Sequence, residues 1–571
     1  MECQRRVCRT SIITGSVRLS TVHFSKRVPS FLGILLLALL SLTLGLRNVA
    51  RAASTNGPNG DGHLILVLPF ENHSTQPGLD WIGESFPTIL NERFHSAGFL
   101  TIRREDRQYS LQHLGLPAGL HPTHATIYRI AQTLDVDEVV LGSYRVENGQ
   151  VTATARILEM RGPRMRAPLQ ESAALNQLLD VEDGLAWQLV RQIDPRFAVE
   201  KQTFLAAGHG LRLDAFENYI RGETEPGIEE QIRHLNAAVQ ISPDYAPALL
   251  ALGKAYFSHQ QYKQAIDTFA RIPRSNPRAL EAQFYSGLAD LYTGQYAQAE
   301  SAFSAVAAVL PLPEVLNNQG VALNRQGQNG TALFQRAVLL DPQNANDWFN
   351  LAVSERRFQH FTKALEAVKK SLALRPDDNE AQHLEQHLLT EVHSSAESAS
   401  TAAPPNAGKG DDMYEPLERI ARTYNETSFR QAAFEMDQMR ALKLQSLPPT
   451  QQAAALCKEG QSYTDQGLLL EAERQFQQAL IADPNSALAH AGLAQIREFT
   501  GNATAAREQA MTSLQLQPNI AAYLVLARLD LQQRQFSAAK EFAQSALHLD
   551  TKNSAALGIL HAIQLQERQV P

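Results

Sequence analysis

The stretch PDYAPALLALGKAYFSHQQYKQAIDTFARIPRSNP, residues 243–277, begins and ends with proline and sets the period of most of the chain. Prolines recur with gaps of 34, 34, 31 and 34 residues in a first run and 34 in a second, at Pro243, Pro277, Pro311, Pro342 and Pro376, then Pro484 and Pro518. A period of 34 residues with proline closing each unit is typical of stacked two-helix repeats. Such repeats form solenoids that present a concave surface rather than a catalytic pocket.

The residues between the prolines supply the packing that such a repeat needs. Small residues stand where two helix axes would approach, as at Gly253, Gly287 and Ala265, and large apolar residues such as Phe269 stand beside them. Several positions agree in consecutive units, and the pattern resembles the tetratricopeptide repeat (TPR) family over residues 211–391 and 451–565. The resemblance implies an all-α superhelical solenoid in two blocks.

One unit of the first block departs from the regular length. Residues 328–331, Gln-Asn-Gly-Thr, stand where the family pattern has about two more residues. We therefore expect a tighter helical hairpin in the unit that ends at Pro342.

Residues 63–195 are predicted to form a separate domain that mixes strands and helices. Residues 63–70 are a short apolar run typical of a buried strand, and Asn148-Gly149 is a hairpin signal between two alternating segments. The motifs VLPFEN (67–72), AQTLDVDEVVLGSY (131–144) and NGQVTATARILEM (148–160) resemble the TolB N-terminal-like domain. That resemblance implies an α/β module with an extracytoplasmic binding or assembly role, and it brings no catalytic residues. The predicted fold class is therefore multidomain, an α/β domain followed by a TPR solenoid.

The first 52 residues have the parts of an export signal in order. Basic residues precede the 16-residue apolar run from Phe31 to Leu46, and Ala50-Arg51-Ala52 fits a cleavage site. The run is shorter than the roughly 20 residues that span a bilayer comfortably. We predict a signal peptide at 1–52, and the alternative is an uncleaved signal anchor. Either leads to a periplasmic or cell-envelope location.

Two further segments separate or follow the repeats. Residues 393–412 are small and polar and include Pro404-Pro405, which predicts a flexible linker. Residues 413–565 are predicted as a second helical block, whose first part (413–447) has helical spacing in Leu417 and Ile420 without a clear repeat.

Composition excludes several classes of function. The net charge of −7 argues against nonspecific nucleic-acid binding, which needs a basic face. Of the three cysteines, Cys3 and Cys8 lie in the predicted signal, which leaves Cys457 as a packing residue and no disulfide framework.

No constellation of residues predicts catalysis or cofactor binding. Around Ser85, the sequence Gly-Glu-Ser-Phe-Pro lacks the last glycine of a nucleophile elbow and lies within a predicted helix. His113, His121 and His124 have no acidic or thiolate partner at metal-ligand spacing. We therefore expect a protein that is not an enzyme and that holds no cofactor or metal.

The concave face of the first block is the predicted binding site. The TPR resemblance places a set of first-helix residues on that face: Lys254, Phe284, Tyr292, Asn317, Asn324, Arg325, Phe349, Arg356 and Arg357. Asparagine can pair with backbone amides and arginine with carboxylates, so this set suits an extended peptide or an acidic segment. The alternative is a mixed, solvated face.

The sequence therefore predicts an extracytoplasmic scaffold that binds a partner protein or peptide in this groove. A second hypothesis is a sensing module, in which the α/β domain binds a signal that the repeats relay.

Overall fold

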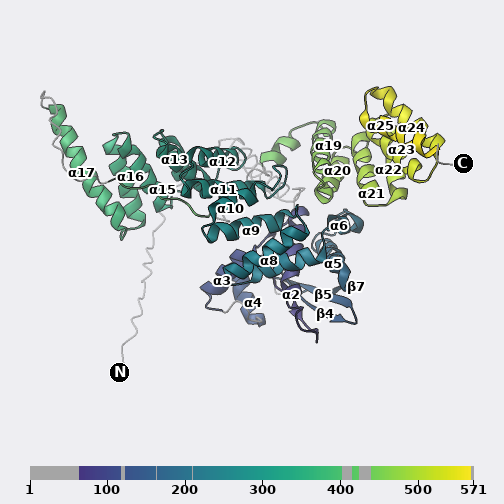
Figure 1. Cartoon of the computed structure of the whole chain (residues 1–571), viewed down its shortest axis with the longest axis horizontal. Coiled ribbons are helices and arrows are strands. Elements are labelled where there is room, and N and C mark those ends of the chain that lie inside the picture. The colour runs from purple at the N-terminus through teal and green to yellow at the C-terminus, as the bar shows by residue number, and fades with distance from the viewer. Residues whose placement is uncertain are drawn as a thin grey trace, which may run out of the picture. The chain divides into compact units, whose positions relative to one another are not determined.

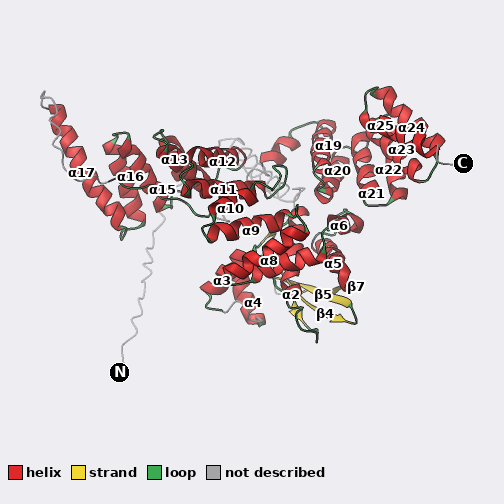
Figure 2. Ribbon diagram, in the orientation of Figure 1, coloured by secondary structure: helices red, strands yellow, loops and turns green. Residues whose placement is uncertain are grey.

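The computed structural model describes residues 63–116, 123–162, 164–208, 210–400, 415–423 and 439–567. Most of these residues are helical, and the strands gather in one sheet close to the beginning of the described chain (Figures 1 and 2). The predicted export signal at 1–52 lies outside the described residues. Within them, no helix is both long enough and apolar enough to cross a membrane.

The α/β domain is built on a mixed sheet with the order β3-β1-β4-β5-β6. Strand β1 (Leu64–Val67) pairs in parallel with β3 (Leu100–Thr101) and with β4 (Glu138–Glu147). Strands β4 and β5 (Gln150–Glu159) form the predicted antiparallel hairpin, turning at Asn148 and Gly149, whose φ values of 51° and 74° belong to the left-handed region. Three shorter strands complete the sheet: β2 (Glu71–Asn72) beside β4, and β6 (Arg164–Met165) and β7 (Leu169–Ala174) beside β5.

Alternation along β1 divides the domain into two hydrophobic layers. Ile65 and Val67 face α2 (Trp81–Ser96) and α5 (Leu178–Ile193). Leu66 and Leu68 face the opposite layer, which includes α4 (His124–Thr133) and the end of α3 (Arg104–His113). Because successive side chains of a strand point to opposite faces, a continuous apolar run such as 64–68 is what a sheet covered on both sides requires.

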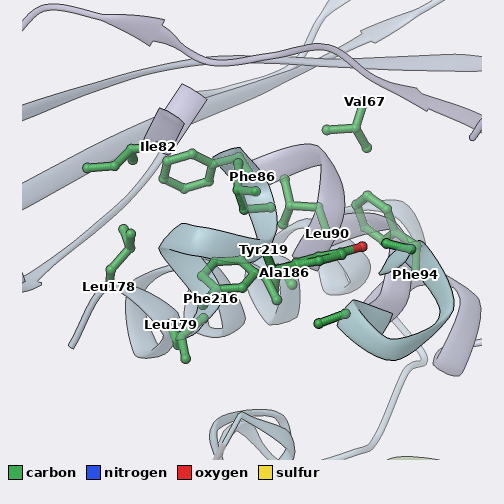
Figure 3. Close-up of a cluster of buried hydrophobic side chains, with 14 of the residues drawn as sticks. Val67, Ile82, Phe86, Leu90, Phe94, Leu178, Leu179, Ala186, Phe216 and Tyr219 are labelled. Atoms are coloured by element: carbon green, nitrogen blue, oxygen red, sulfur yellow. The ribbon is translucent and has the colours of Figure 1, made fainter. Parts of the chain in front are cut away.

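The core on the α2 side continues into the first repeat helix. Figure 3 shows Phe216 and Tyr219 of α7 (Leu213–Thr224) packed under Phe86 and Leu90 of α2. The ring of Trp81 meets that of Phe216 edge-on, with 6.3 Å between centroids. The core therefore continues past residue 195, where the short helix α6 (Lys201–Ala207) forms the connection, whereas the short helix η1 (Leu175–Gln177) joins β7 to α5.

Helix pairs then follow at the period that the prolines predict. The first array comprises α7 with α8 (Ile228–Ile241), α9 (Ala246–Ser258) with α10 (Tyr262–Phe269), α11 (Ala279–Tyr292) with α12 (Tyr296–Val309), α13 (Pro313–Arg325) with α14 (Thr331–Leu340), α15 (Ala345–Arg357) with α16 (Phe361–Leu374), and α17 (Asn379–Ser400). The second comprises α19 (Pro449–Asp465) with α20 (Leu469–Ala482), α21 (Ala487–Phe499) with α22 (Ala503–Leu516), α23 (Ile520–Gln532) with α24 (Phe536–Leu549), and α25 (Ser554–Glu567).

A glycine on the first helix packs against a phenylalanine on the second in four of the helix pairs. A Cβ atom added at Gly253 would lie 2.3 Å from the ring of Phe269, and one at Gly460 would lie 2.8 Å from that of Phe476. Both pairs are sixteen residues apart, whereas Gly320 meets Phe334 after only fourteen. The shortening predicted around Gln328–Thr331 lies in the second helix and not in the turn, because α14 has 10 residues against 14 in α12 and α16.

Two predictions about the middle of the chain are wrong. Helix α17 continues to Ser400, eight residues into the predicted linker, since the first proline or glycine after it is Pro404. Residues 415–423 are not helical but extended, and their contacts are described below. The rest of the predicted linker, 401–412, lies outside the described residues.

The second array contacts the α/β domain. Arg474 of α20 donates to the backbone oxygen of Ser96 over 2.9 Å, and Thr203 of α6 donates to Glu473. Arg497 of α21 approaches the same Glu473 carboxylate at 2.8 Å, and the Glu473 side chain is fully buried. The contacts of Arg474 with Ser96 and of Thr203 with Glu473 join residues that are 378 and 270 positions apart in the chain.

Candidate functional site

The concave face of the first array holds a piece of the chain itself. Residues 415–423, Glu-Pro-Leu-Glu-Arg-Ile-Ala-Arg-Thr, are called the inner segment below. The inner segment runs in extended form against α13, α15 and the beginning of α17, and contacts them through both its main chain and its side chains.

Three asparagine side chains hold the main chain of the inner segment. Asn350 forms both hydrogen bonds with the amide and carbonyl of Arg419, each over 2.7 Å. Asn318 does the same with Ala421, at 2.9 Å to the amide and 2.8 Å to the carbonyl. Asn317 adds a second donor to the carbonyl of Arg419, at 3.0 Å. Side-chain amides here replace the neighbouring strand that an extended chain normally needs.

The helical period explains why these side chains meet. Asn317 and Asn324 are seven residues apart on α13, and Asn350 and Arg357 are seven apart on α15. Seven residues are close to two helical turns, so each pair lies along one face of its helix. Stacking the two helices then brings the asparagines together at one end and the cationic residues at the other.

The carboxylate of Glu418 is enclosed by two arginines that pair with its charge and by one asparagine that donates a hydrogen bond to it. Arg357 lies 2.8 Å from its Oε1 atom, Arg325 lies 3.0 Å from its Oε2 atom, and Asn324 donates to Oε1 over 3.1 Å. The side chain of Glu418 has no solvent exposure. A carboxylate buried in this way is stable only because it is paired and hydrogen-bonded.

Arg419 has the opposite charge and a separate set of partners. Its guanidinium lies over the ring of Phe349, 3.7 Å from the centroid, and donates to both oxygens of Asp378 over 2.6 and 2.8 Å. Glu380 accepts from it over 2.9 Å. The hydrogen bond from Arg419 is the main cause that lowers the pKa of Asp378. The groove therefore offers a positive site for residue 418 and a negative, aromatic site for residue 419.

Acidic residues stand on α13 and α15 between the asparagines and the N-terminal ends of these helices. Glu314 and Asp347 each precede an asparagine by three residues, on the same helix face. Burial raises the pKa of Asp347 to about 8, and the charges of Glu314 and Asp341 act in the same direction.

The structure brings five of the nine predicted groove residues to the inner segment. Asn317, Asn324, Arg325, Phe349 and Arg357 all contact it, as described above. The remaining four have other contacts. Arg356 pairs with Glu391 of α17, Tyr292 stacks on Tyr262, Phe284 is buried beside Phe303, and Lys254 pairs with Glu281 and with Glu105 of the α/β domain.

Sequence reasoning missed several residues of the same surface. Asn318 and Asn350 make the paired main-chain contacts, and Asp378 and Glu380 bind Arg419. One signal was available, since asparagine recurs after 33 residues at Asn317 and Asn350. Nothing in the repeat pattern pointed to Asp378, whose role depends on a segment forty residues away.

Other chemically suggestive residues have structural partners. Ser85 lies inside α2, is fully buried, and donates to Glu182, whose pKa is raised by burial. Cys457 is buried in the second array, and burial raises the pKa of its thiol. Among the described residues, no group of three or more histidine, cysteine, aspartate or glutamate side chains could hold a metal ion. Of the three histidines that the sequence analysis considered as metal ligands, His121 lies outside the described residues.

Comparison with known proteins agrees with the helical architecture. Two models of the tetratricopeptide repeat family match the chain, one at residues 232–291 and the other at 286–345 and 457–519. These parts of the chain are therefore tetratricopeptide repeats, and no catalytic family is indicated. No curated protein matches the chain in sequence.

Similar solved structures include YrrB, MamA and the LpoB C-terminal domain. YrrB, described as a TPR protein with an unusual peptide-binding site, is 18% identical with a TM-score of 0.28, over 35% of this chain and 98% of that one. MamA is 15% identical with a TM-score of 0.26, over 31% and 96%. The LpoB C-terminal domain from Salmonella enterica is 14% identical with a TM-score of 0.19, over 22% and 92%.

Proposed function

We propose that this protein is an interaction scaffold whose first repeat array binds an extended segment of a partner protein. The observation that carries the proposal is the pairing of Asn318 and Asn350 with the main chain of residues 421 and 419. Side chains that pair with both the N–H and the C=O group of alternate residues select an extended peptide, whether it belongs to this chain or to a partner. Tetratricopeptide repeats generally serve as scaffolds for such binding rather than as enzymes.

The proposed location is outside the cytoplasmic membrane. Its support is the order of basic, apolar and small residues in the first 52 positions. The motifs at 67–72, 131–144 and 148–160 further support a TolB-like identity for the α/β domain. N-terminal sequencing of the protein purified from cells tests the export signal: a chain that begins near Ala53 supports cleavage, and recovery from the soluble cytoplasm contradicts export.

Affinity capture with matched variants tests the binding face. The mature full-length chain is immobilised and incubated with envelope extract, beside a groove variant carrying Asn318→Ala and Asn350→Ala. The control carries Gln328→Ala and Gln343→Ala, which remove two exposed amides from turns of the same array. We expect the groove variant to lose binding by about 1–4 kcal/mol, the range for interface anchors, and the control to bind as the wild type does.

Folding must be unchanged for the comparison to count. The helical circular dichroism signal and the melting temperature of all three chains should agree within the range of a surface substitution. Equal capture by the groove variant and the control would place the binding surface elsewhere on the molecule.

A further inference from the structure

We infer that the inner segment is a built-in competitor, and that the partner displaces it with a segment of the same chemistry, an acidic residue followed directly by arginine. This inference rests on the proposed function, because it specifies what the groove of the first array recognises and how access to it is controlled. Four observations on the described residues lead to it.

The first observation is the charge pattern of the groove. Arg325 and Arg357 stand at the C-terminal ends of α13 and α15 and surround the position of residue 418. Asp378 and Glu380 stand at the beginning of α17 and surround the position of the residue 419 guanidinium. A ligand with the reversed order, base before acid, would place like charges together in both sites, which is unfavourable.

The second observation is the register. Asn350 binds residue 419 and Asn318 binds residue 421, two positions along an extended chain, where main-chain groups return to the same side. The register and the charge pattern therefore share residue 419, and the acidic residue 418 directly precedes it. A competing segment must place its acidic and basic residues at the same distance from the paired main-chain groups.

The third observation concerns geometry at the arginine. The guanidinium makes two hydrogen bonds to Asp378 and also lies over the Phe349 ring. A planar fork satisfies both contacts, whereas the ammonium of lysine satisfies neither in the same way. The site is therefore specific for arginine at the second position.

The fourth observation is that the inner segment is covalently part of the chain. A tethered ligand acts at an effective concentration of the order of millimolar. The apparent dissociation constant of a free ligand rises in inverse proportion to the fraction of open grooves. A partner segment of equal intrinsic affinity therefore binds weakly until the inner segment is displaced, which makes the groove self-inhibited.

A peptide titration tests this inference on the full-length chain. The probe is the fluorescently labelled peptide EPLERIART, which copies residues 415–423, and its control is EPLREIART, with acid and base exchanged. The opened chain carries Glu418→Gln and Arg419→Gln. We expect EPLERIART to bind the opened chain at least 10-fold more tightly than the wild type, and EPLREIART to bind neither chain measurably.

A second opened chain guards against misfolding of the first. Ala421→Pro removes the N–H group that Asn318 accepts, without changing any charge. It should give the same gain in affinity for EPLERIART. Introducing Arg357→Ala into either opened chain should abolish that gain, since one of the two cations facing the acidic residue is then missing.

Each contrary result has a distinct meaning. Equal affinity of EPLERIART for wild-type and opened chains would overturn the built-in competitor. Equal binding of both peptides to the opened chains would overturn the acid–arginine order while leaving peptide binding by the groove intact. Opened chains that fold normally and bind neither peptide would overturn this inference together with the proposed binding face.

The remaining alternative is that the inner segment binds in the groove of a second copy of the chain. Sedimentation of the wild-type chain should give the mass of one chain over the concentrations used in the titration. A dimer that dissociates when Glu418→Gln is introduced would overturn the intrachain form of the inference.

Discussion

Glu418 shows how one charged residue can hold a segment that has no secondary structure of its own. Its carboxylate has no solvent exposure and lies within 3.1 Å of donors from two different helices. A buried charge costs several kcal/mol of desolvation unless its partners are well placed, so the segment is stable in only one register. The specificity of the groove therefore depends on paired charges rather than on apolar area.

Asp347 is a residue whose charge should affect stability with pH. Its pKa is about 8 in the folded chain, against about 3.9 for an unfolded aspartate. The folded state then binds more protons between these values, so this residue makes stability fall as pH rises from about 4 to 8. We expect Asp347→Asn to stabilise the chain at pH 8 by about 1–3 kcal/mol, because it removes a buried charge.

The measurement is thermal melting of both chains at pH 5 and pH 8. The difference between them should be larger at pH 8 and should shrink at pH 5, where the wild-type carboxyl is already protonated in the fold. The exposed Asp377, changed to asparagine, serves as the control and should show no such trend. A difference that stays constant with pH would contradict the titration of Asp347.

Among the elements, the turn inside every helix pair from α9–α10 onward repeats one backbone conformation. One residue in that turn has a left-handed φ, with values of 76°, 75°, 77° and 77° at Gly294, Gly327, Gly467 and Gly501. The same conformation occurs at Gln260, Gln359 and Arg534, with φ values of 58°, 63° and 58°. Side chains other than glycine pay about 1–2 kcal/mol there, because Cβ approaches the following carbonyl oxygen.

Replacing such a residue by glycine should therefore stabilise its array. We expect Gln359→Gly to raise the free energy of unfolding by about 0.5–1 kcal/mol, since part of the steric gain is offset by the entropy of glycine in the unfolded chain. The control is Gln264→Gly, at an exposed position inside α10, which should lower it by about 1 kcal/mol. Urea unfolding followed by circular dichroism measures both, and a loss of stability in Gln359→Gly would show that its side chain makes a compensating contact.

The elements also show where sequence reasoning succeeds and where it stops. The 34-residue period predicted the helix pairs, and the missing residues near Gly330 predicted a tighter hairpin, whereas the structure shortens α14 instead. Both are local features, since each repeat is defined by its own packing positions. The helical spacing of Leu417 and Ile420 gave the wrong structure for 415–423, because Asn318 and Asn350 satisfy main-chain groups that a helix would satisfy internally. That competition involves residues some seventy to a hundred positions away and leaves no periodic signal.

The groove itself was partly predictable for the same reason. Asn317, Asn324 and Arg357 were predicted as groove residues from their positions within a repeat, and in the structure each of them contacts the inner segment. Their ligand could not be assigned, since the acidic residue they face lies beyond the first array. Asp378 and Glu380 gain their role only once Arg419 is in place.

At the scale of the whole molecule, three contacts join parts of the chain that are far apart in the sequence, although most of the chain is built from neighbouring repeats. The first repeat helix shares a core with α2, α20 contacts α6, and the inner segment lies in the groove of the first array (Figure 3 shows the first of these). Repeat arrays normally contact only their neighbours. Peptide bonds of segments that make such contacts should be cleaved more slowly by a protease than peptide bonds of segments that make none.

Limited digestion with trypsin should distinguish two nearby regions of the chain. We expect early cleavage after Lys409, which stands between two glycines, and slow cleavage after Arg419, whose main chain and side chain are both engaged. In the Asn318→Ala, Asn350→Ala variant, cleavage after Arg419 should become faster by about tenfold or more, because the asparagines no longer hold the backbone. Mass spectrometry of the first fragments measures both rates.

The control for this digestion is the variant with Gln328→Ala and Gln343→Ala, which should keep the wild-type pattern. If Arg419 were cleaved as early as Lys409 in the wild-type chain, the inner segment would not be held in the groove in solution.

The enclosure of Glu418 also has a consequence for the time course of binding. A partner cannot enter the groove while the carboxylate is paired, so the segment must leave before association proceeds. At high partner concentration, the observed rate should then level off at the departure rate of the segment instead of rising without limit. A single carboxylate held between two helices would in this way set how quickly the protein responds, whatever the abundance of its partner.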